Sequence, residues 1–572
     1  MAITNADIAA IFNKVADLLE IKGENPFKVR AYRNAARTVE NIGKSLVDLV
    51  NEGYDLTKLP GIGHDLSEYI KEIVTTGKFS KLQKLEKEIP SHLVDMLSIE
   101  GLGPKRIKVL YETLHVESME DLRRAAESGE ILKLPGFGPT LVEKILKGIR
   151  LAKKAGHRFR IDVAKNYAQD LVNYIKQIDG IIHIDVAGSY RRRKETVGDL
   201  DILVTAKDWD KVTEHFVKYS GIKEIVSKGP TRSTVILKSD LQVDLRSVPN
   251  ESYGAALHYF TGSKAHNIAI RTRGVKLGLK INEYGVFKGE KRVGGEKEED
   301  VFKSVGLPYI EPELRENRGE IEAAEAGKLP KLVKLDDIVG DLHMHTRYTD
   351  GKNSIEEMAE AAMKKGYKYI AITDHSKRVT VAKGLDEKRL LEQIEEIDKI
   401  NEKLKNFTIL KGIEVDILED GSLDLSNDVL KELDVVVGAV HSKFKLSREK
   451  QTTRVLKAMD NPYFNILAHP TGRLIGSREG YDIDIEKILN HAKENGCYLE
   501  INAQPERLDL NDINAKLAKE MGIKMAISTD AHNIFSLDYM QYGVYQARRG
   551  WCEKEDILNT HSLKELKKLL KR

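Results

Sequence analysis

The chain contains 572 residues, which predicts several domains at roughly 150 residues per domain. It has only two cysteines, Cys497 and Cys552, and no apolar run long enough to span a bilayer, so a disulfide-built secreted protein and a membrane protein are excluded and a cytoplasmic protein is expected. The formal net charge is +3, yet basic residues gather in residues 144–160 and 191–194, and such runs favour a polyanionic partner.

The first 80 residues are predicted to form short amphipathic helices, and a glycine turn recurs in this part of the chain. Three copies at intervals of 40 and 35 residues form an internal repeat: Leu59-Pro60-Gly61-Ile62-Gly63, Ile99-Glu100-Gly101-Leu102-Gly103 and Leu134-Pro135-Gly136-Phe137-Gly138. A single Gly-x-Gly turn usually only connects two helices. Three copies resemble helix-hairpin-helix elements, whose amides approach the DNA backbone without reading its sequence. The implied DNA-binding residues are Gly61, Gly63, Gly101, Gly103, Gly136 and Gly138.

From Arg160 onward, helices alternate with strands. A helix is predicted over 163–178 and strands over 181–187 and 199–205. Two further apolar runs, 233–238 and 241–248, are separated only by Ser239 and Asp240 and therefore predict a hairpin.

A carboxylate cluster is predicted on these strands. Asp199 and Asp201 are two positions apart, so their side chains point to the same face of a strand. A bare Asp-x-Asp is more often an exposed turn, but Gly188-Ser189, ten residues upstream, could present amides and a hydroxyl to a phosphate. Asp244, in the middle of a later strand, adds a third carboxylate. Three carboxylates can hold two divalent ions, which predicts metal-assisted phosphoryl transfer.

Residues 311–338 lack a long apolar period and are predicted to contain a linker, assigned to 319–338. After it, seven apolar strand-like runs alternate with helical segments, which predicts a small βα barrel. Polar residues at the ends of these runs form one set: His343, His345, Asp350, His375, Glu414, His441, His469, Asp530 and His532. One such histidine is usually structural, but six with three carboxylates predict a site for zinc, manganese or iron.

The spacing from Gly188-Ser189 to Asp199-Leu200-Asp201, followed by Tyr259-Phe260-Thr261-Gly262-Ser263, resembles the family X DNA polymerases, the group of DNA polymerase beta. The second half resembles the polymerase-and-histidinol-phosphatase (PHP) domain. The resemblance implies a multidomain α/β protein with helical helix-hairpin-helix domains, an α+β nucleotidyltransferase palm, a thumb and a distorted (β/α)7 barrel. The implied domains are a 5′-phosphate-binding domain 1–85, fingers 86–155, palm 156–250, thumb 251–318, linker 319–338 and PHP domain 339–572.

The resemblance also implies roles for individual residues. Asp199, Asp201 and Asp244 would be the catalytic carboxylates, holding two Mg²⁺ or Mn²⁺ ions. The implied nucleotide-binding residues are Ser189, Arg192, Gly198, Tyr259, Phe260, Gly262, Asn267, Arg271 and Arg160. Gln242 and Lys264 differ from the residues of the beta enzyme at the same positions. Tyr69 occupies the position of that enzyme's Schiff-base lysine. A tyrosine cannot form an imine, so lyase activity by that route is not expected.

The nine polar residues of the second half would hold up to three Mn²⁺, Zn²⁺ or Fe²⁺ ions for phosphate ester hydrolysis. The resulting prediction is a monomeric enzyme that fills short gaps in DNA with deoxynucleoside triphosphates and trims DNA with a 3′-to-5′ exonuclease or phosphoesterase. Two alternatives stay open: the PHP part as a small-molecule phosphatase, and the whole chain as a non-catalytic gapped-DNA-binding protein.

Overall fold

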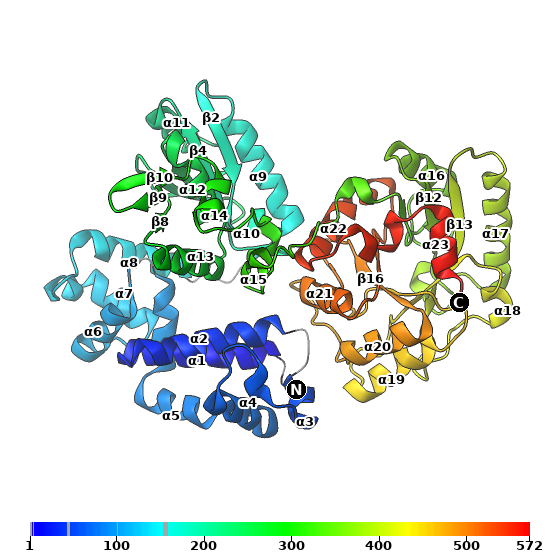
Figure 1. Ribbon diagram of the computed structural model, residues 1–572, viewed down its shortest axis with the longest axis horizontal. Coiled ribbons are helices and arrows are strands. Elements are labelled where there is room, and N and C mark those ends of the chain that lie inside the picture. Colours follow the sequence, from blue (N-terminus) through cyan, green and yellow to red (C-terminus); the bar gives the residue numbers. More distant parts are fainter. Residues whose placement is uncertain (1–2, 4, 43–45, 100, 153–157) are drawn as a thin grey trace. The chain divides into compact units, whose positions relative to one another are not determined.

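The computed structural model describes residues 3, 5–42, 46–99, 101–152 and 158–572 (Figure 1). Lys153 and Lys154 of the predicted basic run lie outside this part of the chain. The protein divides into two compact units, residues 1–157 and residues 158–572. No described helix has the length and apolarity needed to cross a membrane.

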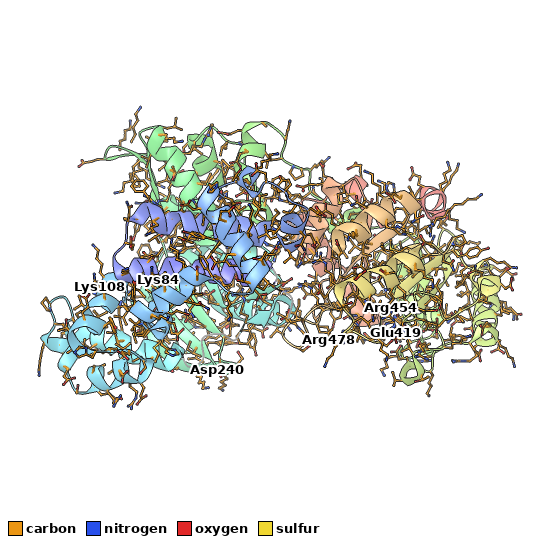
Figure 2. The ribbon with its side chains drawn as sticks, turned by 90° about the horizontal axis from the view of Figure 1, so that it is seen from below. Lys84, Lys108, Asp240, Glu419, Arg454 and Arg478 are labelled. Carbon is orange, nitrogen blue, oxygen red and sulfur yellow. The ribbon has the colours of Figure 1, made fainter. Side chains whose placement is uncertain are left out.

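The first unit is helical throughout its described residues. Its α-helices are α1 (Asn5–Lys22), α2 (Pro26–Asn41), α3 (Leu46–Asn51), α4 (His64–Thr76), α5 (Ser80–Glu88), α6 (Pro104–Leu114), α7 (Met119–Glu127) and α8 (Pro139–Ala152). Ile8, Phe12, Val15 and Leu19 recur at helical spacing along α1 and are buried, which gives α1 one core-facing side. Lys84 of α5 and Lys108 of α6 are labelled in Figure 2.

The repeated glycine turn has the same geometry in its three copies. The first glycine of each has positive φ: Gly61 +75°, Gly101 +91° and Gly136 +83°. In each turn the next residue donates its amide to a carbonyl three residues back, at 3.0–3.2 Å. The second glycine directly precedes α4, α6 or α8. Open space lies around the position that a Cβ would occupy on that glycine, so a backbone phosphate has room to approach.

The second unit begins with a five-stranded sheet of order β2-β4-β7-β6-β5, in which only the β4–β7 pair is parallel. Its strands are β2 (Ile181–Val186), β4 (Asp199–Ala206), β5 (Ile222–Ser227), β6 (Arg232–Leu237) and β7 (Gln242–Ser247). The predicted strands and the hairpin between β6 and β7 are confirmed. The edge strand β5 was not predicted, because its apolar residues Ile222, Ile225 and Val226 do not alternate regularly with polar ones. Helix α9 (Ile161–Ile175) packs on the sheet.

A second subdomain follows, with α12 (Tyr253–Thr261), α13 (Lys264–Lys276), α14 (Glu298–Ser304) and the small sheet of β8 (Lys280–Asn282), β9 (Gly285–Lys288) and β10 (Lys291–Gly294). The segment predicted as a linker is ordered and packed. It contains α15 (Glu320–Glu325) and η6 (Leu335–Asp337), and it buries Glu320 and Val333 completely. Its apolar residues are too scattered along the chain to show a period, but they fill gaps between larger elements.

The remainder is a barrel of seven parallel strands in sequence order: β11 (Gly340–Asp341), β12 (Tyr369–Ile372), β13 (Thr408–Asp416), β14 (Val435–Ala439), β15 (Ile466–Leu467), β16 (Tyr498–Asn502) and β17 (Met525–Ser528). A β-bridge between Met344, which follows β11, and Ala531, which follows β17, joins the first and last strands and closes the barrel. Every residue of β14 is buried, as expected for a parallel sheet covered on both faces. The predicted number of strands is confirmed.

Helices surround this barrel in Figure 1: α16 (Ile355–Lys364), α17 (Glu387–Asn401), α18 (Asn427–Leu430), α19 (Arg448–Met459), α20 (Ile485–Asn495), α21 (Asp512–Glu520), α22 (Met540–Arg549) and α23 (Leu563–Leu570). Arg454 of α19 is buried and lies beside Glu419 in Figure 2. It donates to the carbonyls of Leu418 at 2.8 Å and Ser442 at 2.9 Å. This contact ties the loop after β13 to the loop that carries His441.

Candidate active sites

The predicted carboxylates Asp199, Asp201 and Asp244 lie on the two parallel strands at the centre of the first sheet. Strands β4 and β7 pair with Asp201 opposite Asp244. Asp199 lies two residues before Asp201 and therefore on the same face. The strand pairing thus brings Asp244 beside Asp199 and Asp201, which lie more than 40 residues earlier in the sequence.

Burial and the repulsion between neighbouring carboxylates raise the pKa of two of these groups, Asp199 and Asp201. Burial, with Asp199 and Asp244 nearby, raises the pKa of Asp201 to about 7. Burial and Asp244 also raise the pKa of Asp199. Arg246 opposes the rise in both groups and lies 3.6 Å from Asp201. A cluster of crowded carboxylates with incomplete compensation fits divalent cations, whose charge would relieve the repulsion.

Gly188, at the start of the short helix α10 (Gly188–Arg191), is required by two constraints. Its φ is +64°, and a Cβ at this position would lie 2.9 Å from Oδ2 of Asp201. A larger residue would therefore be strained and would displace the carboxylate. The Gly-Ser signal in the sequence thus marks a close approach between backbone and carboxylate.

The predicted nucleotide-binding residues fall into two groups. Ser189 and Arg192 lie in and after α10, and Gly198 directly precedes β4. Tyr259 and Phe260 lie in the last turn of α12, and Gly262 caps that helix. Asn267 of α13 donates to the carbonyl of Tyr259 at 2.7 Å. Arg192 joins the groups, because it donates to the carbonyl of Thr261 at 2.5 Å.

Two predicted nucleotide contacts lie elsewhere. Arg271 is on the exposed side of α13. Arg160 pairs with Asp162 at 3.1 Å and approaches Glu506 of the barrel to 3.6 Å. Its guanidinium is therefore held by carboxylates in this structure.

The second predicted site is assembled at the carboxyl ends of the barrel strands. Three overlapping groups could each hold a cation: His345, Asp350, His375 and His532; His343, His345 and Asp530; and His375, Glu414 and His441. His469 completes the predicted set, since its Nε2 lies 3.0 Å from Oε1 of Glu414. The structure thus brings all nine residues together.

The nitrogen and oxygen atoms at this site are better placed to bind metal ions than to form hydrogen bonds with one another. Nδ1 of His375 lies 2.7 Å from Oε2 of Glu414, but neither buried atom has a hydrogen-bond partner. Together with His441 they offer ligand atoms within 4.8 Å of one another, as ligands of a common cation do. Burial alone would lower the pKa of His375, but the carboxylates of Glu414 and Asp350 outweigh this effect and raise the pKa to about 10. Burial and the neighbouring His532 and His375 lower the pKa of His345 to about 4. Such opposed shifts are typical of a functional site.

Two carboxylates behind the ligands were not predicted. Glu500 on β16 is fully buried, accepts from His343 Nδ1 at 2.8 Å and accepts the backbone amide of His469 at 2.7 Å. Asp416 lies 3.2 Å from Nδ1 of His441. Both leave the Nε2 atoms of these histidines directed at the site. The available signal was a carboxylate inside an otherwise apolar strand, Tyr498-Leu499-Glu500-Ile501.

Comparisons with known proteins agree with both sites. A helix-hairpin-helix domain matches residues 3–79 and a SAM-like helix-hairpin-helix tandem matches 93–151. The DNA polymerase beta palm matches 160–264, the DNA polymerase beta thumb 256–316 and the PHP domain 341–504. The DNA polymerase/3′-5′ exonuclease PolX of Bacillus subtilis is 43% identical over 573 residues, which cover 99% of each chain. The chain belongs to the family X DNA polymerases that carry a PHP domain.

Other relatives match parts of this family X polymerase. DNA polymerase lambda of Arabidopsis thaliana is 23% identical over 54% of this chain and 62% of its own length. A probable phosphatase of Thermoanaerobacter is 34% identical over 234 residues, covering 39% of this chain and 91% of its own. The predicted family and fold class are confirmed. Membership implies DNA and deoxynucleoside triphosphates as substrates and dependence on divalent metal ions.

Proposed function

We propose that this family X polymerase fills short gaps in DNA at Asp199, Asp201 and Asp244 and removes 3′-terminal nucleotides at the nine-residue site of the barrel. The observation that carries the proposal is that both complete ligand sets occur in one chain that aligns with the B. subtilis PolX over its full length. The separation of the two residue sets predicts that each activity can be removed alone.

The proposed polymerase reaction joins the primer 3′ oxygen to the α-phosphorus of the incoming nucleotide and releases pyrophosphate. Asp199 and Asp201 would hold the cations, and Asp244 would lie nearest the primer hydroxyl. Arg232, 3.1 Å away, and Thr234 hold the Asp244 carboxylate in place. Ser189, Arg192 and Gly198 would bind the triphosphate, and the turn ending at Gly262 would face the sugar. Tyr259, Phe260, Asn267 and Arg271 would line the nucleotide or template.

The proposed nuclease reaction consumes one water molecule and breaks the terminal phosphodiester bond. Glu500 and Asp416 orient His343 and His441. In both sites, bound divalent cations would stabilise charge on the phosphate oxygens and lower the pKa of the attacking group. Two Mg²⁺ or Mn²⁺ ions are proposed for the polymerase site and up to three Mn²⁺, Zn²⁺ or Fe²⁺ ions for the barrel.

The six turn glycines would hold the DNA backbone, with residues 1–85 as the 5′-phosphate-binding domain and 86–155 as the fingers. Open space at Gly63, Gly103 and Gly138 supports this assignment. Palm, thumb and PHP functions are proposed for 156–250, 251–318 and 339–572.

A duplex with a one-nucleotide gap and a labelled primer tests the proposal. With Mg²⁺ or Mn²⁺ and nucleotides, we expect the primer to be extended by one nucleotide. With Mn²⁺ and no nucleotides, we expect the primer to be shortened from its 3′ end. Chelation should stop both reactions. Hydrolysis of a small phosphomonoester with no DNA shortening would instead assign the barrel to small-molecule phosphatases. DNA binding with neither reaction would indicate a non-catalytic protein.

Single substitutions should separate the activities. Asp201→Ala should lower extension at least 1,000-fold, because the loss of a cation ligand removes most transition-state stabilisation, on the order of 4 kcal/mol. His343→Ala should abolish shortening and leave extension within twofold of the wild-type rate. Both rates are read from the same gel. Extension that survives Asp201→Ala would refute the assignment of the polymerase site.

A further inference from the structure

One face of barrel helix α22 contacts the polymerase part of the chain, and two of its residues, Tyr545 and Arg549, reach the segment proposed to bind the triphosphate. The contact residues of α22 are Gln541, Tyr542, Tyr545, Arg548 and Arg549, which recur at i, i+1, i+4, i+7 and i+8 and so share one side of the helix. Tyr542 is buried with Ile161 and Leu508, and the Arg193 guanidinium lies 4.5 Å from the Tyr545 ring centroid. The barrel thus touches the polymerase segment through a formed interface.

Arg549 makes the contacts that reach the proposed nucleotide site. Its guanidinium donates to the backbone carbonyl of Arg192 at 2.7 Å, to Glu316 at 3.1 Å and to Asp512 at 2.7 Å. The Arg549 side chain is only 3% exposed. A planar guanidinium can serve three acceptors in fixed directions, which an ammonium on a flexible stem cannot do as well.

Glu316 connects Arg549 to the Arg192 guanidinium. Nε of Arg192 lies 3.0 Å from Oε1 of Glu316, and both side chains are 12% exposed. When a triphosphate draws Arg192 away from Glu316, loss of Arg549 would leave this buried carboxylate with only the charges of Lys194 and Arg318 to compensate it. Loss of one partner of a buried pair is costly. Arg549 keeps Glu316 compensated in both states and holds the Arg192 backbone still.

We propose that Arg549, a residue of the PHP barrel, is a positioning residue for nucleotide binding in the polymerase site. It acts through the Arg192 carbonyl and through Glu316. The inference rests on the proposed role of Arg192 in binding the triphosphate. It predicts that the barrel supports nucleotide affinity by a contact that is independent of its own metal site.

Arg548 provides a matched control on the same helix. It pairs with Glu313 at 2.8 Å and donates to the carbonyl of Val333 at 3.1 Å. Its loss removes an arginine of similar chemistry from the same interface, but its partners are Glu311, Glu313 and Val333 rather than Arg192 or Glu316. A difference between the two positions therefore separates nucleotide positioning from general docking of the barrel.

The experiment measures kcat and KM for the templated nucleotide on a one-nucleotide-gapped duplex, using the full chain. We expect Arg549→Gln to raise KM about tenfold and to leave kcat within twofold, because a charge-assisted contact in the bound state is lost. Arg549→Lys should raise KM about threefold, a partial rescue. Arg548→Gln should leave KM within twofold. Shortening of single-stranded DNA, measured in parallel, reports an intact barrel.

An unchanged KM in Arg549→Gln, or an equal rise in Arg548→Gln, would overturn the inference. If Arg549→Gln does not fold, Arg549→Lys decides the matter, since it keeps the charge and most of the volume, and an unchanged KM in this variant would also overturn it. Failure of the wild-type chain to extend the primer would reject the proposed polymerase function. Wild-type extension with unaltered variants would reject only the role of Arg549.

Discussion

Individual carboxylates behind the barrel ligands determine how the histidines face the site. Glu500 is fully buried and binds the Nδ1 side of His343 and the amide of His469. It also accepts from Asn502 at 3.0 Å. Because three hydrogen bonds meet at this one carboxylate, it is held in place, and the His343 ring cannot rotate without breaking its bond to Glu500.

We expect Glu500→Gln to lower nuclease activity and Mn²⁺ affinity by about 10- to 100-fold, because the amide no longer fixes the His343 tautomer as a carboxylate does. Activity on labelled single-stranded DNA and calorimetric titration with Mn²⁺ check this. The matched control is Glu494→Gln, on an exposed position of α20, which should change neither value. Unchanged Mn²⁺ affinity in Glu500→Gln would show that Glu500 does not orient a ligand.

The second glycine of a repeated turn, which directly precedes a helix, provides a test of DNA contact. Gly103 precedes α6 with φ −88° and ψ 169°, a conformation that suits any residue favoured at a helix N-cap. Its space is open, so substitution should not disturb packing. The position therefore allows a charge to be placed where DNA phosphate is proposed to bind.

Gly103→Asp should weaken binding of gapped duplex about tenfold, whereas Gly103→Ser should change it less than threefold. Both side chains can cap α6, but only aspartate repels a phosphate. Fluorescence anisotropy at fixed salt measures the affinity, and the melting temperature verifies that neither variant is destabilised. Equal affinities for the two variants would contradict phosphate contact at this turn.

Elements marked by a local sequence pattern could be predicted from the sequence. Contacts between elements far apart in the sequence could not. The strand ends that carry His343, His375 and Asp530 follow apolar runs, and their chemistry is visible locally. Arg549 gave no such signal. Its proposed role depends on Glu316, 233 residues earlier in the chain, and on Asp512, 37 residues earlier, which the fold brings to the same guanidinium.

At the scale of the whole molecule, buried ion pairs couple the barrel to the polymerase segment and make its stability depend on pH. Burial alone would raise the pKa of Glu316. The nearby cations Arg549, Arg192, Lys194 and Arg318 outweigh this effect and lower the pKa to about 2. The folded pKa is thus below the unfolded value. The contribution of Glu316 to stability is complete above about pH 4.5 and is lost as pH falls towards 2.

Glu316→Gln should therefore destabilise the protein by at most about 3 kcal/mol near neutral pH, and its difference from wild type should shrink as pH falls from 5 to 2. Urea unfolding of both proteins at several pH values measures this. Glu322→Gln, at an exposed position of α15, should follow the wild type throughout. A difference that stays constant with pH would exclude charge as its origin.

The buried seam formed by Ile161, Leu508 and Tyr542 also has a practical consequence for preparing a polymerase without nuclease activity. Cutting the chain before the barrel would uncover Ile161 and leave Glu195 without Arg473, its partner at 2.6 Å. A shortened enzyme would then combine loss of the nuclease with exposed apolar surface and a loosened nucleotide segment. Substitution of His343 in the full chain is the cleaner route.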